Sequence, residues 1–116
     1  MPDLIVKNVV KQYPTPSTPL TVLRDISMTL SAGQNLAILG PSGSGKSTLL
    51  HIVGTLDTPT EGTVVLDDQS PFAMSEPDLA RFRNQNIGFI FQDHHLLPQL
   101  SVLENVLVPT LAEGKP

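Results

Sequence analysis

The chain contains no cysteine and no tryptophan, and it has only one tyrosine and four phenylalanines among 116 residues. Without cysteine the protein can form neither a disulfide nor a thiolate metal site. No apolar run approaches the roughly 20 residues that cross a bilayer as a helix. The N-terminal MPDLIVKNVV also lacks the basic segment followed by an apolar segment that marks a secretory signal. These absences favour a cytosolic protein.

Charge is also scarce. Seven Lys and Arg stand against eleven Asp and Glu, so the formal net charge is −4. This balance argues against broad binding to a nucleic-acid backbone. Charged residues make up only 16% of the chain, whereas about a quarter is usual in a soluble domain. We therefore expect another surface to cover part of this one.

The distribution of apolar residues predicts five strands. Residues 4–13 are rich in β-branched side chains, and residues 22–30 show an apolar repeat of period two, as half-buried strands do. NLAIL is expected to be a strand buried on both faces, because it is short and mostly apolar. The five predicted strands are residues 4–13, 22–30, 35–39, 63–68 and 87–91.

Helices are predicted between and after these strands. Residues 46–55 form one, and a second runs from Ser75 to about Asn84. A third begins at Ser101, which forms a capping box with Glu104. Strands that alternate with helices predict an α/β fold.

Residues 40–48, GPSGSGKST, satisfy the pattern G-x-x-x-x-G-K-[ST] through Gly40, Gly45, Lys46 and Ser47. Glycines let the backbone curl so that successive N–H groups point at one anion, and the following helix adds its N-terminal donors. Lys46 supplies a charge for the outer phosphates, and the Ser47 hydroxyl can ligate Mg²⁺. The loop is therefore interpreted as a nucleoside triphosphate site. Its other predicted binding residues are Pro41, Ser42, Gly43, Ser44 and Thr48.

Three stretches together resemble the N-terminal half of an ABC transporter ATP-binding subunit: GPSGSGKSTLLHIVGTLDTPTEG, IGFIFQ and HHLLPQLSVLENVLVP. Within that superfamily the chain is most similar to the lipoprotein-releasing and macrolide-exporter branch. The resemblance implies a P-loop NTPase fold, with a β-rich core to about residue 92 and a helical subdomain from about residue 93. It implies ATP and Mg²⁺ as ligands, and ATP hydrolysis coupled to transport by a membrane permease.

The same resemblance gives roles to single residues. Tyr13 would stack on adenine, because a ring face suits a flat base. Gln92, together with Lys46, would be catalytic, since its amide can reach Mg²⁺ or the attacking water. Residues 93–98, DHHLLP, lie where the family contacts its permease, and the two leucines there suit either a partner surface or the domain's own core.

The resemblance also implies assembly and location. A second ATPase domain would pair head to tail with this one, nucleic acid would not be a partner, and the permease would hold the protein at the cytoplasmic face of the membrane. Hydrolysis in the family uses an apolar strand ending in Asp-Glu, a serine–glycine signature and a switch histidine. Residues 49–116 supply none of them. We therefore expect an incomplete domain with weak nucleotide binding, little turnover and exposed apolar surface.

Three other interpretations stay open at this stage. The chain could be a nucleotide-binding regulatory module without catalysis, or an ABC-type protein that acts on nucleic acid. It could also be a free-standing P-loop kinase or GTPase in which Asp67, at the end of VVLDD, holds the metal. The short distance in sequence from Lys46 leaves little room for a parallel crossover, so an antiparallel strand ending in a polar turn is favoured at Asp67.

Overall fold

The structure is a computed structural model, and it describes residues 3–41, 43–90 and 96–108. The chain divides into two compact units, Met1–Ser75 and Glu76–Pro116. We call them Unit 1 and Unit 2 and describe each by itself. Among the helices of the described residues, none has the length and apolarity needed to span a membrane.

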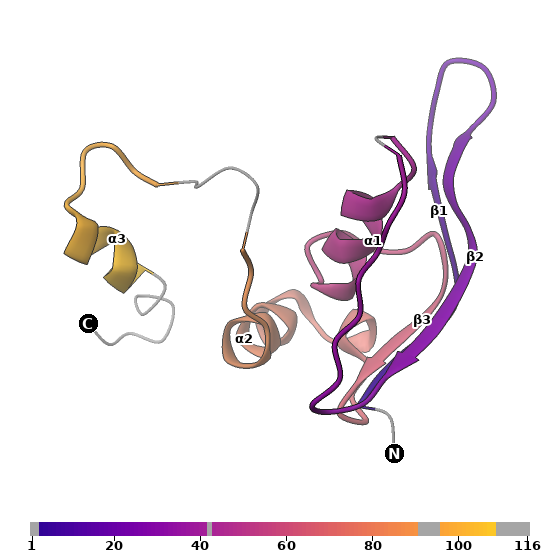
Figure 1. The fold of residues 1–116 in the computed structure, drawn as a ribbon. Coiled ribbons are helices and arrows are strands. Elements are labelled where there is room, and N and C mark those ends of the chain that lie inside the picture. Colours follow the sequence, from indigo (N-terminus) through magenta and orange to yellow (C-terminus); the bar gives the residue numbers. More distant parts are fainter. Residues whose placement is uncertain (1–2, 42, 91–95, 109–116) are drawn as a thin grey trace. The chain divides into compact units, whose positions relative to one another are not determined.

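Unit 1 is built on a three-stranded sheet with the order β2-β1-β3 (Figure 1). Its strands are β1 (Leu4–Tyr13), β2 (Leu20–Leu30) and β3 (Glu61–Leu66). The central β1 pairs antiparallel with both neighbours. The predicted bounds of β1 are confirmed, whereas β2 and β3 each begin two residues before the predicted position.

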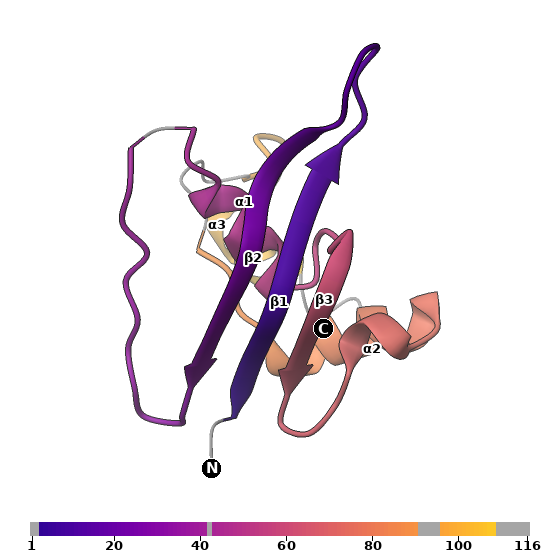
Figure 2. The ribbon, with the colours of Figure 1, turned by 90° about the vertical axis from the view of Figure 1, so that its right-hand side faces the viewer.

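The helix α1 (Lys46–Val53) covers one face of this sheet, and Figure 2 shows it behind the three strands. Its buried residues Leu49 and Ile52 are three positions apart, as expected for one face of a helix. They pack with buried side chains of all three strands. The strand residues of this core are Leu4, Val6, Val9, Leu23 and Val64. Unit 1 also contains the short 3₁₀ helix η1 (Pro71–Ala73).

A bulge interrupts the pairing of β1 with β2 after Val6. Asn8 and Asp25 face each other there, both with positive φ (51° and 52°), and the Asn8 amide donates to Asp25 Oδ1 over 2.7 Å. Gly62 on β3 approaches from the other side with φ 93°, and a Cβ on it would lie 2.3 Å from the Asn8 carbonyl oxygen. Only glycine fits this position without moving the central strand.

The strand predicted at residues 35–39 is wrong. The segment after the turn at residues 31–34 is an extended connection from the end of β2 to α1, without strand pairing (Figures 1 and 2). Leu36 and Leu39 are 51% and 89% exposed. A strand buried on both faces needs neighbours, and no strand of the described residues pairs with this one. The exposure of apolar surface that we expected is confirmed here.

Unit 2 contains α2 (Glu76–Asn86) and α3 (Val102–Leu107). The capping box is confirmed: the Glu104 N–H donates to Ser101 Oγ over 3.1 Å, and the Ser101 N–H donates to Glu104 Oε1 over 2.8 Å. The strand predicted at residues 87–91 is wrong for the described residues 87–90, which pair with no strand and leave Ile90 fully exposed. As for residues 35–39, no strand of the described residues lies beside this segment to pair with it.

Candidate functional site

The glycine-rich loop bends through two glycines with positive φ. Gly43 and Gly45 have φ values of 82° and 94°, a region that side chains rarely adopt. Gly45 caps α1, and the Leu49 N–H donates to its carbonyl over 3.0 Å. Ser42 lies outside the described residues.

Gly45 also lets the loop approach the sheet closely. A Cβ on it would lie 3.0 Å from Leu23 Cδ2 and 3.1 Å from both Val22 Cγ1 and the Val22 carbonyl oxygen. The loop is therefore anchored on β2 at the position where α1 begins. A larger residue would have to push the start of α1 away from β2.

Lys46 folds back over the loop that it follows. Its ammonium group donates to the Gly40 carbonyl oxygen. The turn before it is held by a hydrogen bond of 3.2 Å from the Ser44 N–H to the Pro41 carbonyl, and a Cβ on Gly40 would lie 2.8 Å from Ser44 Oγ. One positive charge thus lies at the residue with which the glycine loop begins.

At the start of α1, no side chain of the helix occupies the capping position that an anion would take. No acidic residue lies in its first turn and no side chain caps it. The first N–H groups of a helix have no partners within the helix, and its dipole favours negative charge at this end. Ser47 is exposed, so its hydroxyl is accessible. These residues fit a triphosphate, and Ser47 fits as a ligand for the accompanying Mg²⁺.

Asp67 does not belong to this loop. Its N–H donates to the Asp3 carbonyl over 2.8 Å, and the neighbouring Leu66 pairs with Leu4. Gly45 instead lies against Leu23, which pairs with Lys11. The two ends of β1 are separated by about 20 Å. The favoured interpretation, an antiparallel strand that ends in a turn, is confirmed, and the role of Asp67 as metal ligand in a P-loop kinase is not supported.

Tyr13 lies at the end of β1 and takes part in a small polar network. Its hydroxyl donates to Asp57 Oδ2 over 3.1 Å. The Lys11 ammonium donates to Asp57 Oδ1 over 3.1 Å and to the Thr58 carbonyl over 2.7 Å, and it lies 5.1 Å from the centre of the Tyr13 ring. We call Lys11, Tyr13 and Asp57 the tyrosine cluster.

The charge of Asp57 is stabilised within this cluster. Burial raises the pKa of its carboxyl, but hydrogen bonds from Lys11, Tyr13 and the Thr58 N–H outweigh burial. The pKa therefore lies below its ordinary value. Neither Lys11 nor Asp57 was predicted as a site residue. The available signal was weak: an aspartate before Thr-Pro in the loop that follows α1.

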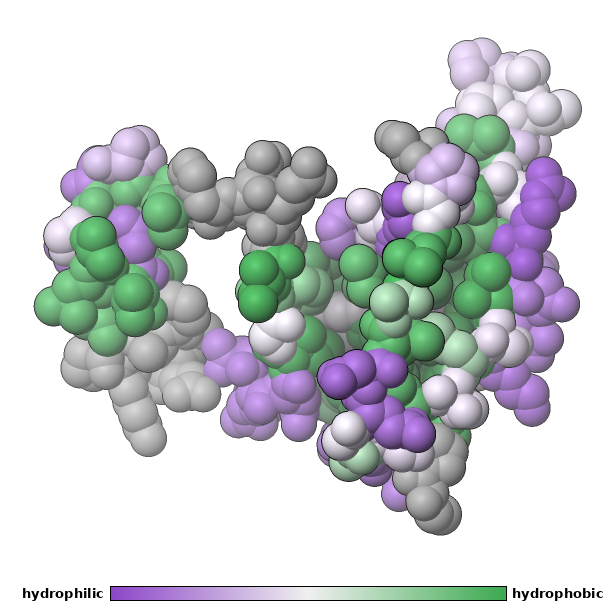
Figure 3. All heavy atoms as spheres, in the orientation of Figure 1, coloured by the Kyte–Doolittle hydropathy of each residue, from purple (hydrophilic) through white to green (hydrophobic). Residues whose placement is uncertain are grey.

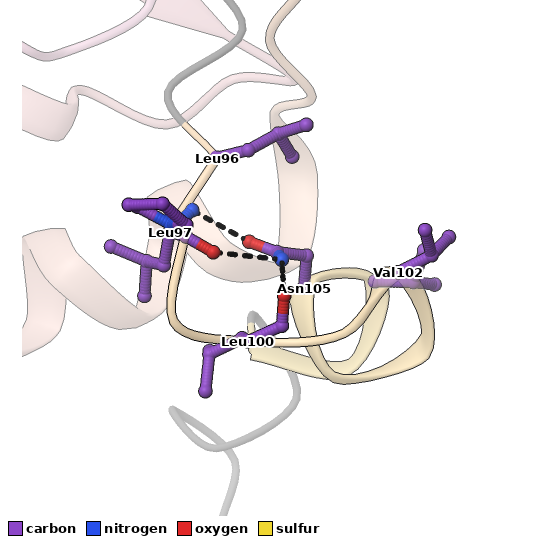
Figure 4. A pocket seen from close by; sticks show the side chains of 7 residues that line it. Leu96, Leu97, Leu100, Val102 and Asn105 are labelled. Carbon is purple, nitrogen blue, oxygen red and sulfur yellow. Dashed lines mark hydrogen bonds between the residues drawn. The ribbon is translucent and has the colours of Figure 1, made fainter.

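Unit 2 contains an apolar pocket of about 650 Å³ beside α3 (Figure 4). The Asn105 side chain organises it: its carbonyl accepts from the Leu97 N–H over 2.8 Å, and its amide donates to the Ser101 carbonyl over 2.9 Å. Leu96 and Leu97 are 55% and 41% exposed, so the core of the described residues does not bury this leucine pair. Apolar side chains also gather on the visible face around α3 in Figure 3. The pocket is lined by Leu96, Leu97, Pro98, Leu100, Val102, Asn105 and Val106.

Besides Ser42, two predicted features fall outside the described residues. They are Gln92 and the first part of the permease-contacting stretch, residues 93–95. Among the residues that the structure describes, no group of three or more His, Cys, Asp or Glu side chains could hold a metal ion. Among the described residues of the glycine loop, Ser47 is therefore the candidate ligand for magnesium.

Comparison with known proteins identifies the family. A family model described as ABC transporter matches residues 23–115. The chain belongs to the ABC transporter family. It corresponds to the N-terminal portion of the ATP-binding domain of that family, so the predicted fold class, the α/β fold of a P-loop NTPase, is confirmed.

Relatives within the ABC transporter family point to one branch. The chain is 61% identical over 113 residues to the lipoprotein-releasing system ATP-binding protein LolD 1 of Rhodopirellula baltica, covering 97% of the chain and 49% of that protein. It is 49% identical over 112 residues to LolD of Shewanella frigidimarina, covering 97% and 47%. The chain therefore spans about half the length of the curated relatives it matches.

Two solved structures of the ATP-binding cassette MJ0796 match this ABC chain. One is a dimer in a post-hydrolysis state bound to ADP and phosphate, with a TM-score of 0.87, 40% identity, and coverage of 93% of the chain and 47% of the cassette. The other is a dimeric bacterial ABC transporter cassette, with a TM-score of 0.90, 38% identity, and coverage of 97% and 49%.

Proposed function

We propose that this chain binds ATP as part of the motor of an ABC transporter, in which ATP hydrolysis drives transport by a membrane permease. The observation that carries the proposal is the glycine loop, with Lys46 folded over its backbone at the start of α1. The related cassette MJ0796 binds ADP and phosphate, and the close LolD relatives are ATP-binding proteins of lipoprotein release.

The proposed roles follow from the chemistry of the loop. Residues 40–48 hold the triphosphate through backbone amides, and Lys46 neutralises its outer phosphates. The Ser47 hydroxyl, with Gln92, serves Mg²⁺, whose chemistry when bound is to draw charge from the phosphate oxygens. Tyr13 supplies the surface on which adenine stacks. Gln92, with Lys46, is proposed as catalytic.

The apolar pocket of Unit 2 is proposed as the contact with the permease. Its lining is almost entirely apolar, and it continues the stretch of residues 93–98 that the resemblance associates with this partner. The helical subdomain is proposed to begin at about residue 93. The protein would thereby be held at the cytoplasmic face of the membrane, with a second ATPase domain as the other partner and no nucleic acid.

Nucleotide binding tests the proposal directly. We expect saturable binding of a fluorescent ATP analogue in the presence of Mg²⁺, and at least about tenfold weaker binding after Lys46→Ala, because a charge-assisted phosphate contact is lost. Lys7→Ala is the matched control, since Lys7 is an exposed lysine on β1. The absence of saturable binding by the wild-type chain would refute the proposal.

Phosphate release provides a second measurement. Because residues 49–116 contain no Asp-Glu pair, the 116-residue chain alone should release phosphate no faster than its Lys46→Ala variant. Ordinary turnover that Lys46→Ala abolishes would mean that the residues present here suffice for hydrolysis.

A further inference from the structure

We propose that Lys11 and Asp57 are positioning residues that hold the Tyr13 ring in the orientation that receives the nucleotide base. This inference rests on the proposed function, ATP binding at the glycine loop. It adds two residues for which neither the loop motif nor the resemblance gives a role. Neither residue is proposed to touch the phosphates or the reacting atoms.

The contacts restrict the ring at two points. The hydroxyl at its tip is bound to Asp57 over 3.1 Å, and the Lys11 ammonium lies over the ring at 5.1 Å from its centre. A tyrosine at the end of a strand, 37% exposed, would otherwise populate several rotamers. Fixing it in advance removes an entropy cost that base binding would otherwise have to overcome.

Lys11 is itself held in place. Its side chain is only 12% exposed, and its ammonium donates to Asp57 and to the Thr58 carbonyl. A lysine engaged in this way cannot reach a phosphate without losing both partners. Its ammonium covers one face of the ring, so the opposite face is the one on which a base can stack.

The phosphate loop and the tyrosine cluster are joined by one rigid element. The helix α1 begins at Lys46 and has eight residues, about 12 Å of length. After its end, the Leu56 and Asp57 N–H groups donate to the His51 carbonyl over 2.8 and 3.3 Å. Asp57 is thereby fixed to the helix whose other end faces the phosphates.

The sheet places the two sites near each other as well. Tyr13 pairs with Leu20 on β2, and Gly45 lies against Val22 and Leu23 of the same strand. The separation along the strand is about 7–10 Å. A single nucleotide is long enough to occupy both sites, with its triphosphate at the loop and its base at the ring.

The experiment separates base binding from phosphate binding. The dissociation constants of Mg-ATP and of inorganic tripolyphosphate are measured for the 116-residue chain and for Asp57→Asn, which preserves shape and removes the charge. We expect Asp57→Asn to weaken ATP binding about three- to tenfold, the range for having to immobilise one loosened side chain on binding, and to leave tripolyphosphate binding unchanged. Asp68→Asn, at an exposed turn, is the matched control.

Three more variants sharpen the result. Tyr13→Ala should weaken ATP binding about ten- to hundredfold, because a base–aromatic stack is lost. Lys11→Met should act like Asp57→Asn, and adding Tyr13→Phe to Asp57→Asn should weaken ATP binding no further than the weaker of the two single variants, since both changes act on the bond between the Tyr13 hydroxyl and the Asp57 carboxylate. Because Tyr13 is the only tyrosine and no tryptophan is present, its emission should also change in Asp57→Asn.

The outcomes distinguish the two proposals. If the wild-type chain binds neither ligand, the proposed function fails, and this inference fails with it. If both ligands bind and Tyr13→Ala or Asp57→Asn leaves the ATP constant unchanged, the inference alone is refuted. If a folded Asp57→Asn variant, checked by circular dichroism, weakens both ligands equally, Asp57 acts only through α1 and the inference is also refuted.

Discussion

The central strand β1 and the extended segment of residues 35–39 lie in the same unit, and both are rich in apolar side chains. In β1 two neighbouring strands satisfy the backbone, and Val6 and Val9 are buried. In residues 35–39 no strand pairing is formed, and Leu36 and Leu39 remain exposed. Since a buried strand must satisfy its N–H and C=O groups, apolar side chains alone do not bury a segment. The neighbouring strands decide the outcome.

A pair of alanine variants tests this comparison with the largest expected effect. Ile52 is fully buried beneath the sheet and Leu39 is 89% exposed. Ile52→Ala should lower the free energy of unfolding by about 2–5 kcal/mol, whereas Leu39→Ala should change it by no more than about 0.5 kcal/mol. Urea unfolding measures both. Equal effects would mean that residues 35–39 pack in solution as firmly as the core.

A pair of glycine variants tests how closely β1 is enclosed. Gly62 has φ 93° and its Cβ would meet the Asn8 backbone at 2.3 Å, whereas Gly33 has φ 83° with no atom within 4 Å. Gly62→Ala should cost about 2–4 kcal/mol, because backbone strain and a clash with β1 add together. Gly33→Ala should cost only about 1 kcal/mol. Thermal unfolding of the two variants measures the loss of stability. Similar losses in both variants would show that the β1 backbone can move to make room for the new side chain.

Local patterns predicted much of the fold. The bounds of β1 and the capping box at Ser101 were readable because each depends on residues within a few positions. Residues 35–39 and 87–90 were wrongly predicted as strands because their partners in a sheet are not encoded locally. An apolar run indicates that a segment is suited to burial, but it does not indicate which other segment covers it.

The candidate site shows the same division. The glycine loop was predicted from consecutive residues, and its positive φ values at Gly43 and Gly45 are confirmed. Within the tyrosine cluster Tyr13 was predicted as a site residue, but Lys11 and Asp57 were not, because they are 46 positions apart in the sequence. Their contact exists only because the antiparallel sheet and α1 bring the end of β1 beside the loop after the helix.

The smallest expected effect is the pH dependence of the stability that the tyrosine cluster contributes at the end of β1. The folded state lowers the pKa of Asp57, so the cluster contributes stability above the unfolded pKa, about 3.9. This contribution is lost as the pH falls through the lower, folded value. The difference in unfolding midpoint between the wild-type chain and Asp57→Asn should therefore be constant from pH 7 to about 5 and should shrink below about 4.

Hydrogen exchange locates this effect. The Gln12 N–H, which donates to Thr60 Oγ1 over 2.9 Å, should lose protection below about pH 4 relative to Asp57→Asn. Residues 35–39 contain no titratable side chain. Once corrected for its intrinsic pH dependence, the hydrogen exchange of these residues should therefore not change when the Asp57 carboxyl is protonated. A matching change in both segments would show that the two open together, and the contrast between a paired strand and an unpaired one would not hold.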